Sequence, residues 1–327
     1  MSVSARQWGR GEADRAAEPG QVTGGRAARA GGRWAGLREL VAPVGIYVAS
    51  RLVMLMAAGF AALINATTGR SNGTGPWPAV PAARVGALAV LERWDSAWYI
   101  SVAQHGYPAR PVATDLGRVA FFPLYPLLTR GLAAVGLPVV DAALIMSTMF
   151  GGAAAVLLFF LAKRTAGVPA AVRVTALFCF FPGAFVLSMA YSEGLMLTAA
   201  VGCLWALVER RWLLAGLAAA VATATRPTAV ALCFACAWAA GQAIAQRRDW
   251  RSLIAPALSP LGVLAYFGYL AVHTGHVSEW FRSERVIWHE HVDPAGLPGR
   301  LYAGLRHPVG VAGPLRDING LVALAGA

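Results

Sequence analysis

The stretch VVDAALIMSTMFGGAAAVLLFFLAKR, residues 139–164, decides the fold class. Between Asp141 and Lys163 it contains no charged residue. A helix of roughly 20 apolar residues, rising 1.5 Å per residue, is long enough to cross a ~30 Å hydrocarbon core. The pattern therefore predicts a transmembrane helix over 139–162 that ends in the basic pair Lys163-Arg164.

Comparable apolar runs recur along the chain. Only 13% of the 327 residues are charged and 57% are hydrophobic, whereas an ordinary soluble domain carries about 25% charged residues. Arg226-Pro227 divides the longest run, because a midplane charge and a proline are both costly inside a helix. The sequence predicts an all-α, polytopic transmembrane helix bundle whose other spans are 41–65, 168–188, 191–209, 212–225, 228–245 and 253–272.

The net charge of +12 raises the alternative of a nucleic-acid-binding protein. Most of the arginines, however, lie in the first forty residues and in the connections between apolar runs, as the positive-inside rule requires of a membrane protein. We therefore expect membrane lipid as a partner and no nucleic acid. Residues 1–40, which lack a hydrophobic period, are expected to form a disordered basic cytoplasmic tail before a transmembrane domain at 41–327.

Threading the spans from a cytoplasmic N-terminus puts every short basic connection on one face. Residues 66–138 and 273–316 then become two large loops on the extracytoplasmic side of a multi-pass cell-membrane protein. This threading requires 121–136 to lie at the interface without crossing. The amphipathic run 85–104 is expected to lie there too, with Trp94, Trp98 and Tyr99 at headgroup level. The apolar run that starts before Ala327 suggests that the chain continues beyond it.

Three ionisable residues of the outer face are candidates for chemistry. Asp95 can be a general base, or it can cap the following helix or pair with Arg93. Glu193 begins an apolar run, where a carboxylate also favours a helix N-terminus. Arg226 interrupts an apolar run, and such a residue at membrane depth is a functional candidate suited to phosphate.

A metal site is not predicted. His289-Glu290-His291 places adjacent residues on different faces of a helix, unlike the spacing of zinc helices. No phosphate-binding glycine loop or nucleophile elbow occurs in a suitable context. A divalent metal remains compatible with the chain, but no cofactor is implied.

The chain resembles the PIG-V (GPI mannosyltransferase 2-like) family of the GT-C superclass of glycosyltransferases. The resemblance is carried, in order, by RWDSAWYISVAQHGY (93–107), AFFPLYPLL (120–128), FFPGAFVLSMAYSEG (180–194), ATATRPT (222–228) and EWFRSERVIWHEH (279–291). It implies a GT-C-like helix bundle with interfacial helices in the first outer loop. It also implies transfer of mannose from polyprenyl-phosphate-mannose to an acceptor hydroxyl on the extracytoplasmic face, with inversion.

The resemblance assigns provisional roles to individual residues. Trp94 and Asp95 match the family's Trp-Asp pair, which makes Asp95 the expected base. Tyr191, Ser192 and Glu193 match its Tyr-Ser-Glu motif and are expected to face the same cavity. The arginine expected near the leaving phosphate is Arg226, and the other expected substrate-binding residues are Arg282, Arg285 and Trp288.

Two alternatives stay open at this point. The donor can carry another lipid-linked sugar, or the protein can be a lipid or solute transporter without transferase activity. The acceptor, whether a glycolipid, a polysaccharide or a protein, is not determined by these residues.

Overall fold

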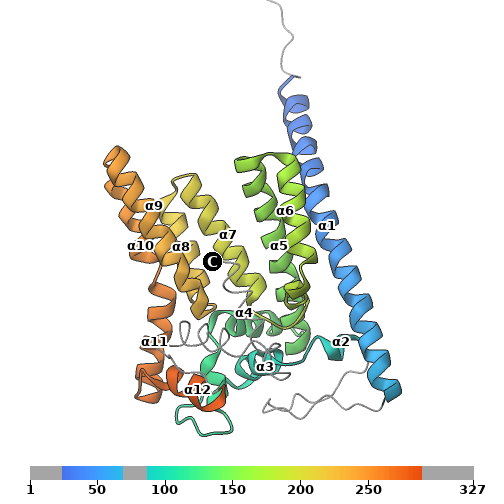
Figure 1. Ribbon diagram of the computed structural model, residues 1–327, viewed down its shortest axis with the longest axis vertical. Helices are drawn as coiled ribbons and strands as arrows, with labels where there is room; N and C mark the ends of the chain where they lie inside the picture. Colours follow the sequence, from blue (N-terminus) through green and yellow to red (C-terminus); the bar gives the residue numbers. More distant parts are fainter. Residues whose placement is uncertain (1–23, 69–86, 289–327) are drawn as a thin grey trace, which may run out of the picture.

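The computed structural model describes residues 24–68 and 87–288 and is all-α over these ranges (Figure 1). The predicted all-α, polytopic helix-bundle class is confirmed. In chain order the helices are α1 Gly24–Thr68, α2 Ala87–Val90, α3 Asp95–His105, η1 Leu116–Ala120, α4 Leu124–Ala133, α5 Val139–Ala166, α6 Val168–Phe180, η2 Pro182–Ser188, α7 Glu193–Val208, α8 Trp212–Thr223, η3 Pro227–Val230, α9 Ala231–Arg247, η4 Trp250–Leu253, α10 Ile254–Leu258, α11 Leu261–Thr274 and α12 Glu279–Ile287.

Among the described residues, four helical stretches are long and apolar enough to cross a membrane: Glu39–Thr67, Val139–Ala166, Pro227–Arg247 and Trp250–Thr274. A fifth candidate is the pair α6 and η2, which is bent by 76°. The remaining apolar helices are shorter, since α7 has 16 residues and α8 has 12. Each predicted run therefore lies on a helix, but two of these helices are short for a simple span.

The two ends of the bundle differ in charge. Helices α2, α3, α4 and α12 lie at the lower end in Figure 1, and the basic connections lie at the opposite end. At the basic end, Lys163 pairs with Glu39 at 2.8 Å, and Arg164 pairs with Glu209 at 3.5 Å. Helices α5 and α7 are thus tied together at the end remote from α3.

Small residues allow the central helices to approach closely, as is common in membrane bundles. A Cβ added to Gly194 would lie 2.7 Å from the carbonyl oxygen of Ser147, where α7 crosses α5. A Cβ added to Gly262 would collide with the backbone of Ala220 and Ala224 on α8. Both contacts support helices that end near Glu193 and Arg226.

We expect Gly262→Val to destabilise the fold. Overpacking of this kind costs about 1–3 kcal/mol, and backbone atoms cannot move aside as a side chain can. The midpoint of thermal unfolding in detergent should fall by several degrees. Gly268→Val, on the same helix, is the matched control because nothing lies within 4 Å of a Cβ at Gly268. Equal midpoints for the two variants would contradict the prediction.

Two expectations are wrong in part. Helix α1 begins at Gly24, so residues 24–40 are not disordered; alanine and arginine are strong helix formers that extend the span. Trp98 and Tyr99 are each only 3% exposed and pack inside the protein instead of facing headgroups. The predicted disorder of residues 1–23 and the part of the predicted outer loop from 289 to 316 fall on residues outside the described ranges.

Candidate active site

A charged cluster forms where three distant segments meet at the α3 end of the bundle. We define it as Asp95 and Tyr99 from α3, Tyr191, Ser192 and Glu193 from the start of α7, and Arg226 from the connection between α8 and η3. The sequence explains the meeting point. Proline at 227 cannot continue a helix, α8 ends at Thr223, and Arg226 is held in an extended conformation.

Arg226 is the centre of this cluster. Its Nη1 donates to Glu193 Oε1 at 2.7 Å, and it approaches the hydroxyl oxygens of Tyr99 and Ser192 at 3.5 Å. Nη2 and Nε make no hydrogen bond within the described chain, and neither atom is among the fully buried atoms that lack a partner. One edge of the guanidinium is therefore fixed by protein, and its other donors are available to an anionic group.

Asp95 presents a carboxylate that no described side chain engages. Its backbone N–H donates to the hydroxyl oxygen of Tyr191 at 3.2 Å, and its carboxylate oxygens form no hydrogen bond or ion pair with the described residues. Burial raises the pKa of Asp95, and the charge of Arg226 opposes that rise. The carboxylate is therefore close enough to Arg226 to be influenced by its charge and is free to accept a proton.

The two structural interpretations of Asp95 are both wrong. Helix α3 has Trp94 at its N-cap position, and no side chain caps it. No ion pair joins Asp95 to Arg93. Asp95 is the first residue of α3, but its carboxylate bonds to none of the free N–H groups there, and it lies close enough to Arg226 to be influenced by that charge.

The backbone before Asp95 is strained. Trp94 has φ of +56° and ψ of −126°, a region that a bulky residue rarely adopts and that costs on the order of 1–3 kcal/mol. Its side chain is 49% exposed, with its ring 6.1 Å from that of Phe185. The strained turn sets the direction in which α3 begins and leaves an aromatic face beside Asp95.

The start of α7 is anchored to α5. Ser147 Oγ donates to the carbonyl oxygen of Tyr191 at 2.8 Å and also lies 2.7 Å from the hydroxyl of Tyr125. Tyr191 is 6% exposed, so it presents little surface, and its hydroxyl accepts the backbone N–H of Asp95. Glu193 Oε2 is buried without a hydrogen-bond partner among the described residues. This leaves one acceptor oxygen of the Arg226–Glu193 pair unused.

Besides Trp94, which precedes Asp95, three of the expected substrate-binding residues lie outside the charged cluster. Arg282 pairs with Glu279 at 3.0 Å and is half exposed, and Arg285 is exposed on α12. Trp288 packs against Trp98 and Phe121, at ring distances of 6.0 and 5.7 Å. The structure does not bring either α12 arginine to Arg226, because α12 rests on η1.

Tyr99 belongs to the cluster, although the sequence analysis assigned it to the headgroup level. Its hydroxyl lies 2.6 Å from Ser192 Oγ, and burial raises its pKa. Tyr99 follows Asp95 by four residues, so the two share a helix face. That spacing is the signal that could have identified it.

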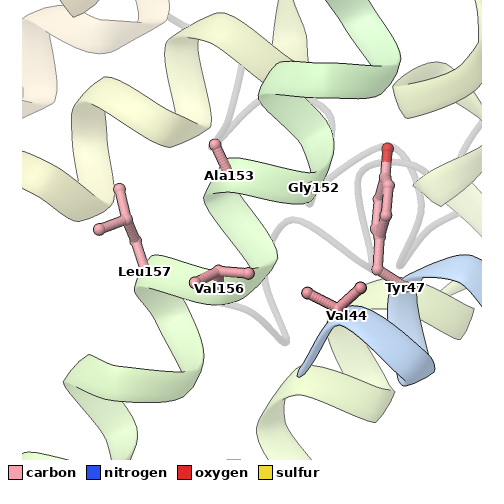
Figure 2. Close-up of a pocket in the computed structure, with 6 residues that line it drawn as sticks. All are labelled: Val44, Tyr47, Gly152, Ala153, Val156 and Leu157. Atoms are coloured by element: carbon pink, nitrogen blue, oxygen red, sulfur yellow. The ribbon is translucent and has the colours of Figure 1, made fainter. Parts of the chain in front are cut away.

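The pocket in Figure 2 is a separate feature. It measures about 420 Å³, lies between α1 and α5, and is lined by Val44, Tyr47, Gly152, Ala153, Val156 and Leu157. None of the predicted site residues lines it. Among the described residues, no group of three or more His, Cys, Asp or Glu side chains could hold a metal ion; His289-Glu290-His291 lies outside that part of the chain.

The fold and the charged cluster together define an integral membrane protein with a polar site at one end of a helix bundle. The family model described as mannosyltransferase (PIG-V) matches residues 78–253, which is more than half of the chain and contains every member of the cluster. The chain therefore belongs to the PIG-V mannosyltransferase family and is an integral-membrane mannosyltransferase. No curated protein and no solved structure matches the chain significantly.

Proposed function

We propose that the protein transfers mannose from polyprenyl-phosphate-mannose to an acceptor hydroxyl, with inversion at the anomeric carbon, and that Asp95 is the catalytic base. The observation that carries this proposal is the approach of an unengaged carboxylate to a half-engaged guanidinium. Asp95 and Arg226 come from segments far apart in the sequence. Family membership indicates that the sugar is mannose. The arrangement provides the two groups that transfer requires, a base and a cation for the phosphate.

The proposed reaction is a single displacement. The acceptor hydroxyl attacks the anomeric carbon as its proton passes to the Asp95 carboxylate. The bond between the anomeric carbon and the phosphate oxygen breaks, and its electron pair leaves with the polyprenyl phosphate. Arg226 Nη2 and Nε are positioned to donate to that phosphate, whose negative charge grows in the transition state.

The remaining residues of the charged cluster orient Asp95 and Arg226 for the proposed reaction. Glu193 and Tyr99 hold one edge of Arg226, which orients its free donors. Trp94 offers an aromatic face to the sugar ring beside Asp95. In this proposal Arg282, Arg285 and Trp288 contribute to the outer surface through which substrates arrive.

We place the site on the extracytoplasmic side of the cell membrane and the N-terminus in the cytoplasm. The basic connections lie at the end of the bundle opposite α3 and α12 (Figure 1), and basic connections face the cytoplasm in most membrane proteins. The acceptor is then an extracytoplasmic glycolipid, polysaccharide or protein.

The test is transfer by the purified protein with defined donors. Polyprenyl-phosphate-mannose should be consumed only when an acceptor fraction is present, and the product anomer, determined by NMR, should be opposite to that of the donor. Transfer of glucose or arabinose in place of mannose would assign another lipid-linked sugar. Retention of the donor anomer would exclude the single displacement.

The rate should depend on pH through Asp95. The base must be deprotonated, so kcat/KM should fall as the pH drops through the pKa of Asp95. Because burial raises this pKa, we expect the midpoint of the acid limb above about 3.9, the ordinary value of aspartate. A profile of initial rates measures it, with size-exclusion chromatography showing that the fold persists at each pH. A flat profile through this midpoint would contradict the assignment.

A further inference from the structure

A second arginine is buried in this bundle, far from the charged cluster in the sequence. Arg51 lies in the middle of the candidate span Glu39–Thr67 and is 8% exposed. No described carboxylate lies within ion-pair distance of it. Ionisable residues at this depth usually serve a function, and Arg51 precedes the residues that match the family model.

The partners of Arg51 converge on one irregular segment. Nη1 donates to the carbonyl oxygen of Ala184 at 2.8 Å and to Ser188 Oγ at 2.9 Å, and Nη2 donates to the carbonyl oxygen of Cys179 at 3.1 Å. The guanidinium also lies 5.1 Å from the centre of the Tyr47 ring. Three of its four hydrogen bonds therefore reach the segment 179–188.

This segment is where α6 breaks and turns by 76° into η2. Pro182 has no N–H, so the chain cannot continue the helix, and carbonyl groups at the break lose their usual donors. A buried carbonyl in a membrane protein needs a replacement donor. Arg51 provides it to Cys179 and Ala184, and its positive charge also favours the carboxyl end of α6.

The broken segment leads directly into the charged cluster. Ser188, which Arg51 holds, precedes Tyr191 by three residues and Glu193 by five. Tyr191 in turn accepts the backbone N–H of Asp95. The conformation of the break therefore sets where the Tyr-Ser-Glu segment meets Asp95 and Arg226.

We propose that Arg51 is a positioning residue of the active site: its guanidinium fixes the break between α6 and η2 so that Tyr191, Ser192 and Glu193 reach Asp95 and Arg226. The effect on transfer rests on the function proposed above, and the effect on the 182–193 segment does not. Arg51 itself touches no member of the cluster.

The test compares Arg51→Lys, Arg51→Met and Ser188→Ala with the control Thr67→Ala. Thr67 lies on the same helix as Arg51, and its hydroxyl donates to the carbonyl oxygen of Ile64 within α1. We expect kcat to fall about tenfold or more in Arg51→Met, as misplacement of catalytic groups does, with the donor KM changed less than about twofold. Lysine keeps the charge and part of the donor set, so Arg51→Lys should lie between wild type and Arg51→Met, and Thr67→Ala should match wild type.

Hydrogen exchange measured by mass spectrometry gives a readout that does not depend on activity. In Arg51→Lys and Ser188→Ala, amide exchange should accelerate in residues 182–193 and stay unchanged in α5 and α8. Unchanged exchange and unchanged kcat in both variants would overturn the proposal, as would equal acceleration throughout the bundle. If exchange responds as expected but wild type transfers no mannose, the positioning role stands and the proposed reaction fails.

Discussion

Asp95→Asn is expected to lose mannose transfer by about 10²- to 10⁴-fold, the usual contribution of a general base. Asparagine has nearly the same size but cannot accept the proton of the acceptor hydroxyl. The fold should persist, because the Asp95 carboxylate makes no hydrogen bond with the described chain and only its backbone N–H binds Tyr191. Initial rates with polyprenyl-phosphate-mannose measure the loss, and the donor KM should change little.

Asp115→Asn is the matched control for this experiment. Asp115 lies on the same side of the bundle, and its carboxylate binds the backbone of Val112 and the side chain of Arg118. Its replacement should change local structure without removing a base from the charged cluster. An Asp95→Asn enzyme that is folded and as active as wild type would remove Asp95 from the proposed mechanism.

Arg226→Met is expected to reduce kcat by about 10²- to 10³-fold, comparable to the loss of a donor that stabilises transition-state charge. The variant loses the guanidinium donors proposed to face the phosphate. It also leaves the Glu193 carboxylate buried without its 2.7 Å partner, which destabilises the fold. The double variant Glu193→Gln/Arg226→Met removes that unpaired charge, so it should regain thermal stability but not transfer activity.

Further variants, measured beside Arg226→Met, test whether the loss of activity is specific to Arg226. Arg164→Met breaks another arginine–glutamate pair between α5 and the end of α7, at the opposite end of the bundle, and should leave kcat unchanged. The charge of Arg226 lowers the pKa of Asp95. Arg226→Lys keeps that charge and should leave the midpoint of the acid limb unchanged, whereas Arg226→Met removes it and should raise the midpoint. A double variant with wild-type kcat would exclude Arg226 from the reaction.

The apolar runs and the Arg226-Pro227 interruption were sufficient to predict the helix bundle, because burial in a membrane leaves few other backbone conformations. The same reasoning predicted that 121–136 does not cross, and α4 over Leu124–Ala133 is not among the candidate spans. The bounds of α7 and α8 also agree with the predicted runs 191–209 and 212–225 to within two residues at each end.

The candidate site was predictable in part. Asp95, Glu193 and Arg226 are polar residues in apolar surroundings, and the structure places them together. Sequence position could not show that α12 keeps Arg282 and Arg285 exposed on its surface, because that depends on how α12 packs against η1. The sequence placed Tyr99 at the membrane interface because it could not show that the rings of Phe121 and Tyr125 cover it. Arg51 carried a signal of its own, a lone charge inside the apolar run 41–65.

Helices α5 and α7 run side by side but do not end at the same level. The close contact of Gly194 with Ser147 leaves the α5 residues from Val139 to Met146 projecting past the start of α7, a distance of about 12 Å at 1.5 Å per residue. Helices α3 and α4 pack against this projecting end of α5, so the charged cluster lies between helices and not at the tip of the bundle. In the proposed reaction, that level would let the phosphate of a carrier lipid reach Arg226 while the lipid chain stays in the bilayer, and the acceptor hydroxyl would come from the aqueous phase.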